Sequence, residues 1–349
     1  MNIKEKFGAF INTSKFSAFL KGVDVELRDG TRLCIRIKSS TRMTHGVGLR
    51  VSRYSYRTDI EGDGIIETGY GDDDSSLLAF QKSVAEGIER LVYRITLRRH
   101  LDLYTTNGWA CHLTSAKAEQ AALEELAERD AVLVHWLRKI PMLEIDHATL
   151  PQFLKDWQDR ELSQHLSLRK VRVLLTHEGF APAVVIILQD EKGYSVTASA
   201  TGKTLEGAVI KGLNEACRLG SNLEKRYYFL SSRALRDVEG AVVSPPDHGL
   251  LYAYHEKLPQ WIFGDKKSWK QVSGKWEEEY RHFRERNFHF EFHQIMSAPL
   301  VVGYGISRDM QRLFFGKTRV VESLGYINHK RLNLKAGEEI PNLLPHFIA

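Results

Sequence analysis

The spacing of apolar residues along the chain predicts three long helices. In LLAFQKSVAEGIERLVYRITLRR, apolar residues recur every three or four positions, as on the buried face of a helix: Leu77, Phe80, Val84, Ile88, Leu91 and Ile95. SAKAEQAALEELAERDAVLVHWLR, which ends near Pro141, and TLEGAVIKGLNEACRLGSNLEKRYYFL predict a second and a third helix. The acidic residues and serines of Asp72-Asp73-Asp74-Ser75-Ser76 predict the capped start of the first helix, with a metal site at the three aspartates as the alternative.

Strands are predicted on both sides of these helices. Residues 23–70 read as β-rich, and VRVLLTH, PAVVIILQD and YSVTASA follow after about residue 170. Pro245 and Pro246 mark a loop within 231–249, and the last 60 residues return to short strands. We therefore expect an α+β protein with three regions: a β-rich part at 1–70, a core at 71–230 and a C-terminal part of the same domain at 231–349.

Composition narrows the class of protein. The chain has 349 residues with 43% hydrophobic and 27% charged residues, which excludes collagen, coiled coil and wholesale disorder. Its net charge of +5 favours anionic ligands but is too small for a nucleic-acid footprint. Cys34, Cys111 and Cys217 are too few and too scattered for a disulfide framework, which predicts a reducing cytoplasm. We expect no membrane segment, since no apolar run approaches 18 residues.

A glutamate pattern is repeated in the first two helices. Ser83-x-x-Glu86-x-x-Glu89-Arg90 in the first is echoed by Ala122-x-x-Glu125-x-x-Glu128-Arg129 in the second. In each copy the two glutamates lie on one face and repel each other. One interpretation is local pairing, of Glu86 with Arg90 and of Glu125 with Arg129, on solvated faces. The other is that the two faces line a site for Mg²⁺ and phosphates.

The third helix carries Lys211, Glu215 and Arg218 on one face. These residues either bind phosphate and metal or form a salt-bridged surface stripe. Thr197-Ala-Ser-Ala-Thr-Gly-Lys203-Thr204 resembles a phosphate loop, but Thr197 replaces the first glycine, which favours a plain strand, turn and helix.

Two further clusters are candidates for binding sites. His289, Glu291 and His293 alternate along a predicted strand, which favours a half-buried strand over a transition-metal site. The basic stripe of the first helix lacks interleaved aromatic residues and therefore favours acids or phosphate over nucleic acid: Arg90, Arg94, Arg98 and Arg99.

Taken in order, these motifs resemble the YcaO-like family of ATP-dependent enzymes. Besides Ser83 to Arg90, the similarity includes Thr106-Asn107-Gly108-Trp109-Ala110, then Glu125-Leu-Ala-Glu128-Arg129-Asp130-Ala131, and Ala198 through Arg218. It continues more loosely through Leu313-Phe-Phe-Gly316 and the tail Pro341-Asn-Leu-Leu-Pro345-His346. The last two segments resemble the branch that makes azoline rings in ribosomally made peptides.

The resemblance implies a fold, two cofactors and a set of site residues. It implies pseudo-symmetric sheet and helix units with three helices converging on an ATP/Mg site. The implied Mg²⁺ ligands are Glu86, Glu89, Glu125, Glu128 and Glu215. The implied ATP contacts are Ser83, Arg90, Asn107, Arg129 and Lys211. Pro345, His346 and Ala349 would lie near the substrate and assist catalysis.

The implied activity is ATP-dependent cyclodehydration of a precursor peptide, of the kind found in bacteriocin biosynthesis. Expected partners are that peptide, a separate leader-peptide-binding protein, a flavin dehydrogenase acting on the product, and a second copy of the chain in a homodimer. Thioamide formation by the same chemistry is one alternative. Three departures from the family pattern, Leu113, Lys117 and Tyr70, leave a second: a catalytically degenerate peptide-binding scaffold.

Overall fold

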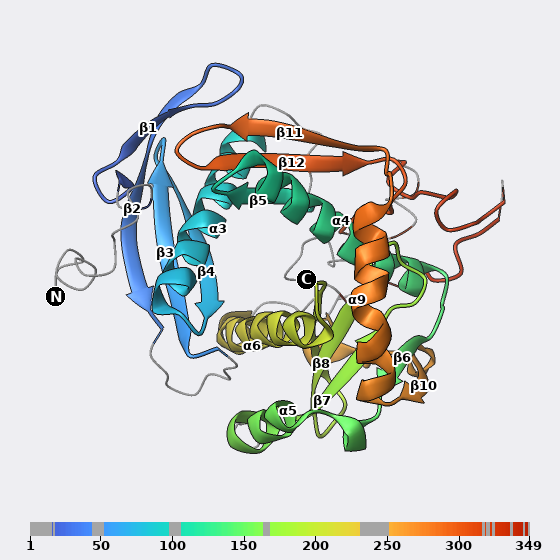
Figure 1. The fold of residues 1–349 in the computed structure, drawn as a ribbon. Helices are drawn as coiled ribbons and strands as arrows, with labels where there is room; N and C mark the ends of the chain where they lie inside the picture. The colour runs from blue at the N-terminus through green and yellow to red at the C-terminus, as the bar shows by residue number, and fades with distance from the viewer. Residues whose placement is uncertain are drawn as a thin grey trace. The chain divides into compact units, whose positions relative to one another are not determined.

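The computed structural model describes most of the chain, and its described residues form two compact units (Figure 1). Unit 1 takes in residues 1–46, 52–123 and 290–307, and unit 2 takes in 47–51, 124–289 and 308–349. These boundaries come from backbone packing and differ from those of the three sequence regions. The described residues are 16, 18–43, 52–97, 106–162, 168–230, 251–315, 318, 322, 325–335, 338–344 and 346–347.

Unit 1 pairs a four-stranded antiparallel sheet with one long helix. The sheet has the order β1-β2-β3-β4, with bounds Val23–Glu26, Arg32–Arg42, Tyr54–Gly62 and Ile65–Asp73. Helix α3 (Ser76–Leu97) packs on this sheet through the predicted apolar face, and Val84, Ile88 and Leu91 are fully buried against Ile35 and Ile60. The same unit holds a second sheet, of order β11-β12-β5, with bounds Phe290–Met296, Val301–Ser307 and Trp109–His112.

Two glycines let β4 lie directly on α3. A Cβ atom built on Gly69 would lie 2.1 Å from the Ser83 carbonyl oxygen, and one on Gly71 would lie 2.0 Å from the Ala79 carbonyl oxygen. No side chain fits at either position, since the obstructing atoms belong to the helix backbone. Gly69-Tyr70-Gly71 is therefore a strand that fixes the height of α3 above the sheet.

Unit 2 is built on a five-stranded sheet of order β10-β6-β7-β8-β9. Its strands run over Phe263–Lys267, Met142–Ile145, Leu168–Leu175, Val184–Asp190 and Ser195–Ala200. The helices of this unit are the part of α4 (Ser115–Leu137) from Glu124 onward, α5 (Gln152–Trp157), α6 (Leu205–Leu230) and α9 (Trp269–Glu285). Short helical turns cover His147–Thr149, Gln158–Leu162, Leu251–His255 and Gln260–Ile262.

The sheet of unit 2 is covered on both faces. One face packs on α6, where Ile186 and Leu188 contact a core that includes Ala208 and Leu213 (Figure 1). The other face carries Val185 and Ile187, which share a core with the second half of α4 and with Phe347 near the C-terminus; Val132, Leu133, Trp136 and Leu137 are the α4 members. Burial on both faces explains why PAVVIILQD reads as a continuous apolar run rather than an alternating one.

The element predictions are confirmed for the three long helices and for the mixed class of fold. Two local predictions were incomplete. Trp109–His112 forms a strand, β5, that the sequence pattern missed. Beyond Ser307, the described residues contain no strand, although short strands were expected to the end of the chain. The predicted loop at 231–249 lies outside the described residues. Across the part of the chain that the structure describes, no helix is long and apolar enough to cross a membrane.

Candidate functional site

A charged cluster in unit 2 joins α4, β9 and α6. It contains five of the predicted site residues: Glu125, Glu128 and Arg129 from α4, and Lys211 and Glu215 from α6. Glu128 and Arg129 are buried, with side chains 2% and 10% exposed, whereas the Lys211 side chain is 54% exposed. The cluster therefore has an internal part on α4 and a part on α6 that faces solvent.

Glu128 is the centre of this cluster. Its Oε1 accepts a hydrogen bond from the Ser199 hydroxyl at 2.9 Å, and its Oε2 accepts one from the Thr201 backbone N–H at 3.0 Å. Lys211 Nζ lies 3.4 Å from the same Oε2. Both carboxylate oxygens are thus held by protein donors, so Glu128 ties α4 to the end of β9 and to α6.

Arg129 contacts the same network from the other side. Its Nη1 donates to the Ser199 hydroxyl at 2.6 Å and lies 3.3 Å from Glu128 Oε1, and its Nη2 lies 4.0 Å from Glu215. Arg129 Nε is buried and has no hydrogen-bond partner among the described residues. A buried donor of this kind is costly to leave unsatisfied. This part of the cluster can therefore accept one more oxygen.

The two glutamates of α4 differ in the direction of their pKa shifts. Burial raises the pKa of Glu125 to about 7, because the charges of Glu128 and Glu215 add to that effect and Arg129 and Lys211 offset only part of it. For Glu128, burial also raises the pKa, but the cations of Lys211 and Arg129 and the Ser199 hydroxyl outweigh it, so its pKa is lowered. Glu128 is therefore a fixed carboxylate, and Glu125 is one that a nearby cation would ionise.

Burial lowers the pKa of Lys211, but the nearby carboxylates, led by Glu128, outweigh it and raise that pKa. Lys211 therefore stays charged while its side chain reaches solvent. A charged, half-exposed lysine beside carboxylates is suited to meeting phosphate oxygens. Because Mg²⁺ is usually held by one or two carboxylates together with substrate phosphates, Glu125 and Glu215 fit that ion. Among the described residues no three acidic, histidine or cysteine side chains form a metal cluster by themselves, so phosphate oxygens would complete the ion's coordination.

Unit 1 holds the first copy of the glutamate pattern. Glu86 Oε1 lies 2.5 Å from Arg90 Nη2, and Glu86 Oε2 accepts the Tyr70 backbone N–H at 2.7 Å. Arg90 also donates to the Thr68 carbonyl at 3.1 Å. The predicted local pairing is thus confirmed for Glu86 and Arg90, and both residues tie α3 to β4.

The other predicted residues of unit 1 lie near the same helix or on β5. Ser83 is buried and exchanges a hydrogen bond with the Thr58 hydroxyl at 2.7 Å. Burial raises the pKa of the Cys111 thiol, and the charge of Glu89 adds to this, which places Glu89 toward β5. Asn107 is half-buried in the turn before β5, where Gly108 takes a φ of 78°. The ten predicted ATP and Mg²⁺ contacts thus lie as five in unit 1 and five in unit 2.

The C-terminal tail docks on unit 2. His346 is fully buried, its Nε2 contacts the Phe314 carbonyl, and its ring packs on Phe314 and Phe315. The Thr197 hydroxyl donates to the Phe347 carbonyl at 2.5 Å. Since residues two apart on a strand share a face about 7 Å apart, Phe347 lies on the same face of β9 as Ser199. Pro345, Ala349 and Gly316 lie outside the described residues.

Several contacts of this cluster were missed by the sequence analysis. Ser199 and Thr201 stood inside the segment that was compared with a phosphate loop. Asp130, which follows Arg129, is fully buried and forms a two-pronged ion pair with Arg331 at 2.8 and 2.9 Å. A local signal existed for Asp130 in the motif itself, but none linked it to a residue 201 positions away.

The alternatives weighed for the remaining motifs are resolved by their contacts. The first turn of α3 is capped by Ser75, whose hydroxyl accepts the Leu78 backbone N–H at 3.4 Å, whereas Asp73 accepts the Ser75 N–H at 2.8 Å and pairs with Lys82. Thr204 accepts the Gly207 backbone N–H at 3.1 Å, so the segment at 197–204 is the plain strand, turn and helix. His289 pairs with Asp309, and the described residues hold no metal cluster that would include it.

This combination defines a class: a mixed helix and sheet protein with an acidic and basic cluster suited to magnesium and phosphate. A family model described as YcaO cyclodehydratase, ATP- and Mg²⁺-binding, matches residues 88–290. The match covers more than half of the chain, which therefore belongs to the YcaO family. It contains Glu89, Arg90 and all five residues of the unit 2 cluster. The prediction of ATP and Mg²⁺ as cofactors is confirmed by this family assignment.

Solved structures are similar to this chain at low sequence identity. A heterocyclase in complex with substrate and cofactor has a TM-score of 0.56 and 12% identity, covering 88% of this chain and 55% of its own, so the chain spans about half of that protein's length. YcaO from Methanopyrus kandleri, bound with AMPPCP and Mg²⁺, has a TM-score of 0.49 and 14% identity, covering 77% of this chain and 84% of its own.

The E. coli microcin synthetase McbBCD complex with pro-MccB17 bound contains a chain with a TM-score of 0.49 and 12% identity, covering 86% of this chain and 97% of its own. Among curated proteins, no relative matches the sequence.

Proposed function

We propose that this chain uses ATP to activate a backbone amide of a ribosomally made precursor peptide and so forms thiazoline and oxazoline rings. The observation that carries the proposal is the buried network around Glu128, which holds the two cations Arg129 and Lys211 beside Glu125 and Glu215. The family assignment supports the use of ATP and Mg²⁺ by this network. The azoline product and the precursor-peptide substrate are what we propose beyond the family assignment.

The proposed reaction proceeds in balanced steps. The thiol or hydroxyl of a Cys, Ser or Thr attacks the carbonyl carbon of the preceding amide. The γ-phosphoryl group of ATP is then transferred to the amide oxygen, and ADP is released. That oxygen departs as phosphate when the ring C=N bond forms, so the peptide loses one water per ring. Negative charge spreads over the phosphoryl oxygens during transfer, and positioned cations stabilise it.

The residues of unit 2 have distinct roles in this proposal. Arg129 and Lys211 contact phosphate oxygens, and Glu128 holds both cations in place. Glu125 and Glu215 hold Mg²⁺, which supplies positive charge to the phosphates when it is bound. The remaining predicted site residues keep their proposed roles: Ser83, Arg90 and Asn107 toward ATP, Glu86 and Glu89 toward Mg²⁺, and Pro345, His346 and Ala349 toward the substrate.

Calorimetric titration with ATP, with and without Mg²⁺, tests this proposal. We expect Mg²⁺-dependent binding to the wild-type chain that Glu125→Gln weakens by tenfold or more, about 1.4 kcal/mol. Glu119→Gln is the matched control, because Glu119 is an exposed glutamate on the same helix. Equal weakening by both substitutions, or none by Glu125→Gln, would contradict the assignment of Glu125.

A catalytically degenerate scaffold is the second candidate. It is favoured by Leu113 and Lys117, which stand where the family pattern has other residues; both are exposed, Leu113 just before α4 and Lys117 in its first turn. A wild-type chain that binds a precursor peptide but no Mg-ATP would select this function. Thioamide formation is separated from cyclodehydration by product mass, because sulfur replaces oxygen in one case and a water is lost in the other.

The proposal includes partners. We propose that a separate leader-peptide-binding protein delivers the substrate, that a flavin dehydrogenase acts on the product, and that the chain forms a homodimer. Copurification of the chain with a co-expressed partner and peptide tests the first of these. Size-exclusion chromatography with light scattering tests the last.

A further inference from the structure

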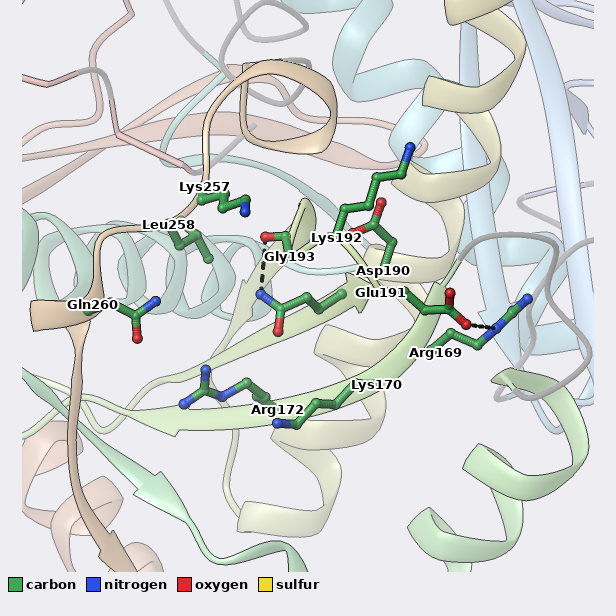
Figure 2. A pocket seen from close by; sticks show the side chains of 11 residues that line it. Arg169, Lys170, Arg172, Asp190, Glu191, Lys192, Gly193, Lys257, Leu258 and Gln260 are labelled. Atoms are coloured by element: carbon green, nitrogen blue, oxygen red, sulfur yellow. Dashed lines mark hydrogen bonds and ion pairs between the residues drawn. The ribbon is translucent and has the colours of Figure 1, made fainter.

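A basic pocket lies in unit 2, at one end of its five-stranded sheet. It has a volume of about 450 Å³ and is lined by residues of β7, the β8–β9 hairpin and the segment before β10. Five cationic side chains and two acidic ones surround it: Arg169, Lys170, Arg172, Lys192, Lys257, Asp190 and Glu191. In Figure 2, Lys257 lies above the pocket, and Lys170 and Arg172 lie below it. The pocket is therefore positively charged.

The two arginines of the pocket are already paired. Arg172 makes a two-pronged ion pair with Glu144 at 2.8 and 2.7 Å and lies 3.4 Å above the ring of Phe263. Arg169 lies 3.5 Å from Glu191, as the dashed line in Figure 2 marks. The guanidinium groups of both arginines are therefore already engaged with carboxylates.

The acidic Asp190 belongs to the hairpin turn. Its carboxylate accepts the Tyr194 backbone N–H at 2.8 Å, and its carbonyl accepts the Gly193 backbone N–H at 3.2 Å. These contacts use the Gly193 and Tyr194 backbone N–H groups, which are therefore not free to hold a phosphate. What remains for a ligand is three lysines.

Lys170, Lys192 and Lys257 are exposed and form no ion pair with any residue that the structure describes. Lysine ammonium groups are compact charges on flexible stems, which suit carboxylates spaced along a chain better than one phosphate held in a fixed geometry. The pocket is also open to solvent, so a peptide can cross it.

The pocket lies on the same sheet face as the Glu128 cluster. Gln189, which lines the pocket, donates to the Ser195 hydroxyl at 3.3 Å. Ser195, Thr197 and Ser199 alternate along β9 and point to one face, where Thr197 contacts the tail and Ser199 contacts Glu128. Three strand residues lie between Ser195 and Ser199, which are therefore about 13 Å apart. The side chains of Ser195, Thr197 and Ser199 are buried, so the pocket and the Glu128 cluster are separate sites on one sheet.

We propose that this pocket binds an acidic segment of the peptide substrate that lies outside the residues reacting at the Glu128 cluster. The inference rests on the proposed function, because it takes the Glu128 cluster as the site of amide activation. Attraction between the lysines and the substrate's carboxylates raises the rate of encounter and fixes the direction of the peptide.

The experiment measures binding of a fluorophore-labelled hexaglutamate peptide by fluorescence anisotropy at low salt. The test variant combines Lys170→Gln, Lys192→Gln and Lys257→Gln. The control variant combines Lys270→Gln, Lys275→Gln and Lys335→Gln, three exposed lysines of the same unit outside the pocket. We expect the test variant to weaken binding by about tenfold or more, the control to leave it nearly unchanged, and added salt to weaken binding to the wild-type chain.

Three outcomes would overturn the proposal. Equal weakening by both variants would show that only net charge matters, and unchanged binding to the test variant would exclude the pocket. Displacement of the peptide by equimolar inorganic phosphate would make the pocket a phosphate site. Circular dichroism checks that both variants fold.

Mg-ATP calorimetry on the same proteins separates this inference from the proposed function. If peptide binding does not depend on the three lysines but Mg-ATP still binds, only the pocket proposal is rejected. Lysine-dependent peptide binding by a wild-type chain without Mg-ATP binding rejects the proposed function and leaves an acidic-peptide site.

Discussion

The two copies of the glutamate pattern differ in how their charges are held. In unit 1, Glu86 pairs with Arg90 one helical turn away, and the two side chains are 22% and 39% exposed. In unit 2, Glu128 and Arg129 are 2% and 10% exposed and are held by Ser199, Thr201 and Lys211 from other elements. The same residue pattern thus forms a partly exposed pair that contacts one neighbouring strand in unit 1, and a buried network joining three elements in unit 2.

The two copies share a residue pattern, but their ion pairs should contribute unequally to stability. A surface ion pair contributes little because water screens it, whereas a buried charge that loses its partner is strongly destabilising. We therefore expect matched substitutions in the two copies to have unequal effects. Four predictions test this contrast, in order of decreasing expected effect.

The largest effect is expected for Glu128→Gln. The new amide would place an N–H₂ group against the Thr201 N–H, or against Ser199 and Arg129, and would remove the charge that holds Lys211. Breaking a buried ion pair of this kind costs about 3 to 5 kcal/mol in the free energy of unfolding. Urea denaturation and, separately, hydrogen exchange of the α4 amides measure this loss of stability.

Glu125→Gln is the control for that substitution. Because the pKa of Glu125 is raised to about 7, its carboxyl is already partly protonated at neutral pH, and an amide there costs little. The same substitution was predicted above to weaken Mg-ATP binding. Similar losses of stability in both variants would show that the two glutamates are not distinguished by their surroundings.

A second prediction compares a close backbone contact in each unit. Gly71→Ala would place a Cβ atom 2.0 Å from the Ala79 carbonyl oxygen, which the helix cannot move aside. Gly212→Ala in α6 would meet a side-chain atom of Ile186 at 2.7 Å, and that side chain can adjust. We expect a loss of about 3 kcal/mol or more for Gly71→Ala and a clearly smaller loss for Gly212→Ala. Thermal unfolding of both variants measures this, and equal losses would refute the distinction.

These contacts also show what the sequence could predict. The helical faces of α3, α4 and α6 followed from apolar spacing, and the pairing of Glu86 with Arg90 was one of two interpretations of the charge spacing. The same interpretation paired Arg129 with Glu125, but the ion pairs of Arg129 among the described residues are with Glu128 and Glu215. Ser199 lies 71 residues from Glu128, and such a contact depends on how β9 and α4 pack, which no local spacing encodes.

The basic pocket was missed for the same reason. Lys170, Lys192 and Lys257 come from three separate segments, and the short basic run at Arg169 to Arg172 does not indicate which other lysines lie near it. By contrast, the family motifs drew attention to the Glu128 cluster because its residues recur in a fixed order. Motif spacing thus identified the site that has a sequence signature, and only the sheet topology brought the pocket's lysines together.

A third prediction concerns pH and is specific to unit 2. His135 is fully buried at the end of α4, where its Nε2 accepts the His177 and Glu178 backbone N–H groups at 3.0 and 3.2 Å. Burial lowers its pKa to about 4, although the Ile140 carbonyl partly offsets this. The unfolded chain binds a proton near pH 6.5 and the folded chain does so only near pH 4, so the stability from neutral His135 is complete above pH 6.5 and is lost as pH falls to 4.

We expect this linkage to remove about 2 kcal/mol at most between about pH 7.5 and pH 5. His135→Gln keeps a side-chain acceptor but does not titrate, so its unfolding free energy should lack this part of the pH dependence. Urea titrations at both pH values measure the difference. A variant that loses stability with acid as steeply as the wild-type chain would assign the effect to other groups.

The smallest effect is expected for Glu86→Gln in unit 1. The substitution removes a half-exposed ion pair with Arg90, while the new side-chain carbonyl can still accept the Tyr70 N–H. We expect a loss of less than about 1 kcal/mol in the free energy of unfolding, with hydrogen exchange in α3 almost unchanged. A loss as large as that of Glu128→Gln would mean that greater exposure to water does not weaken the first copy. Weaker Mg-ATP binding without loss of stability would instead show that Glu86 acts on the nucleotide, because its structural role is too small to explain such a change.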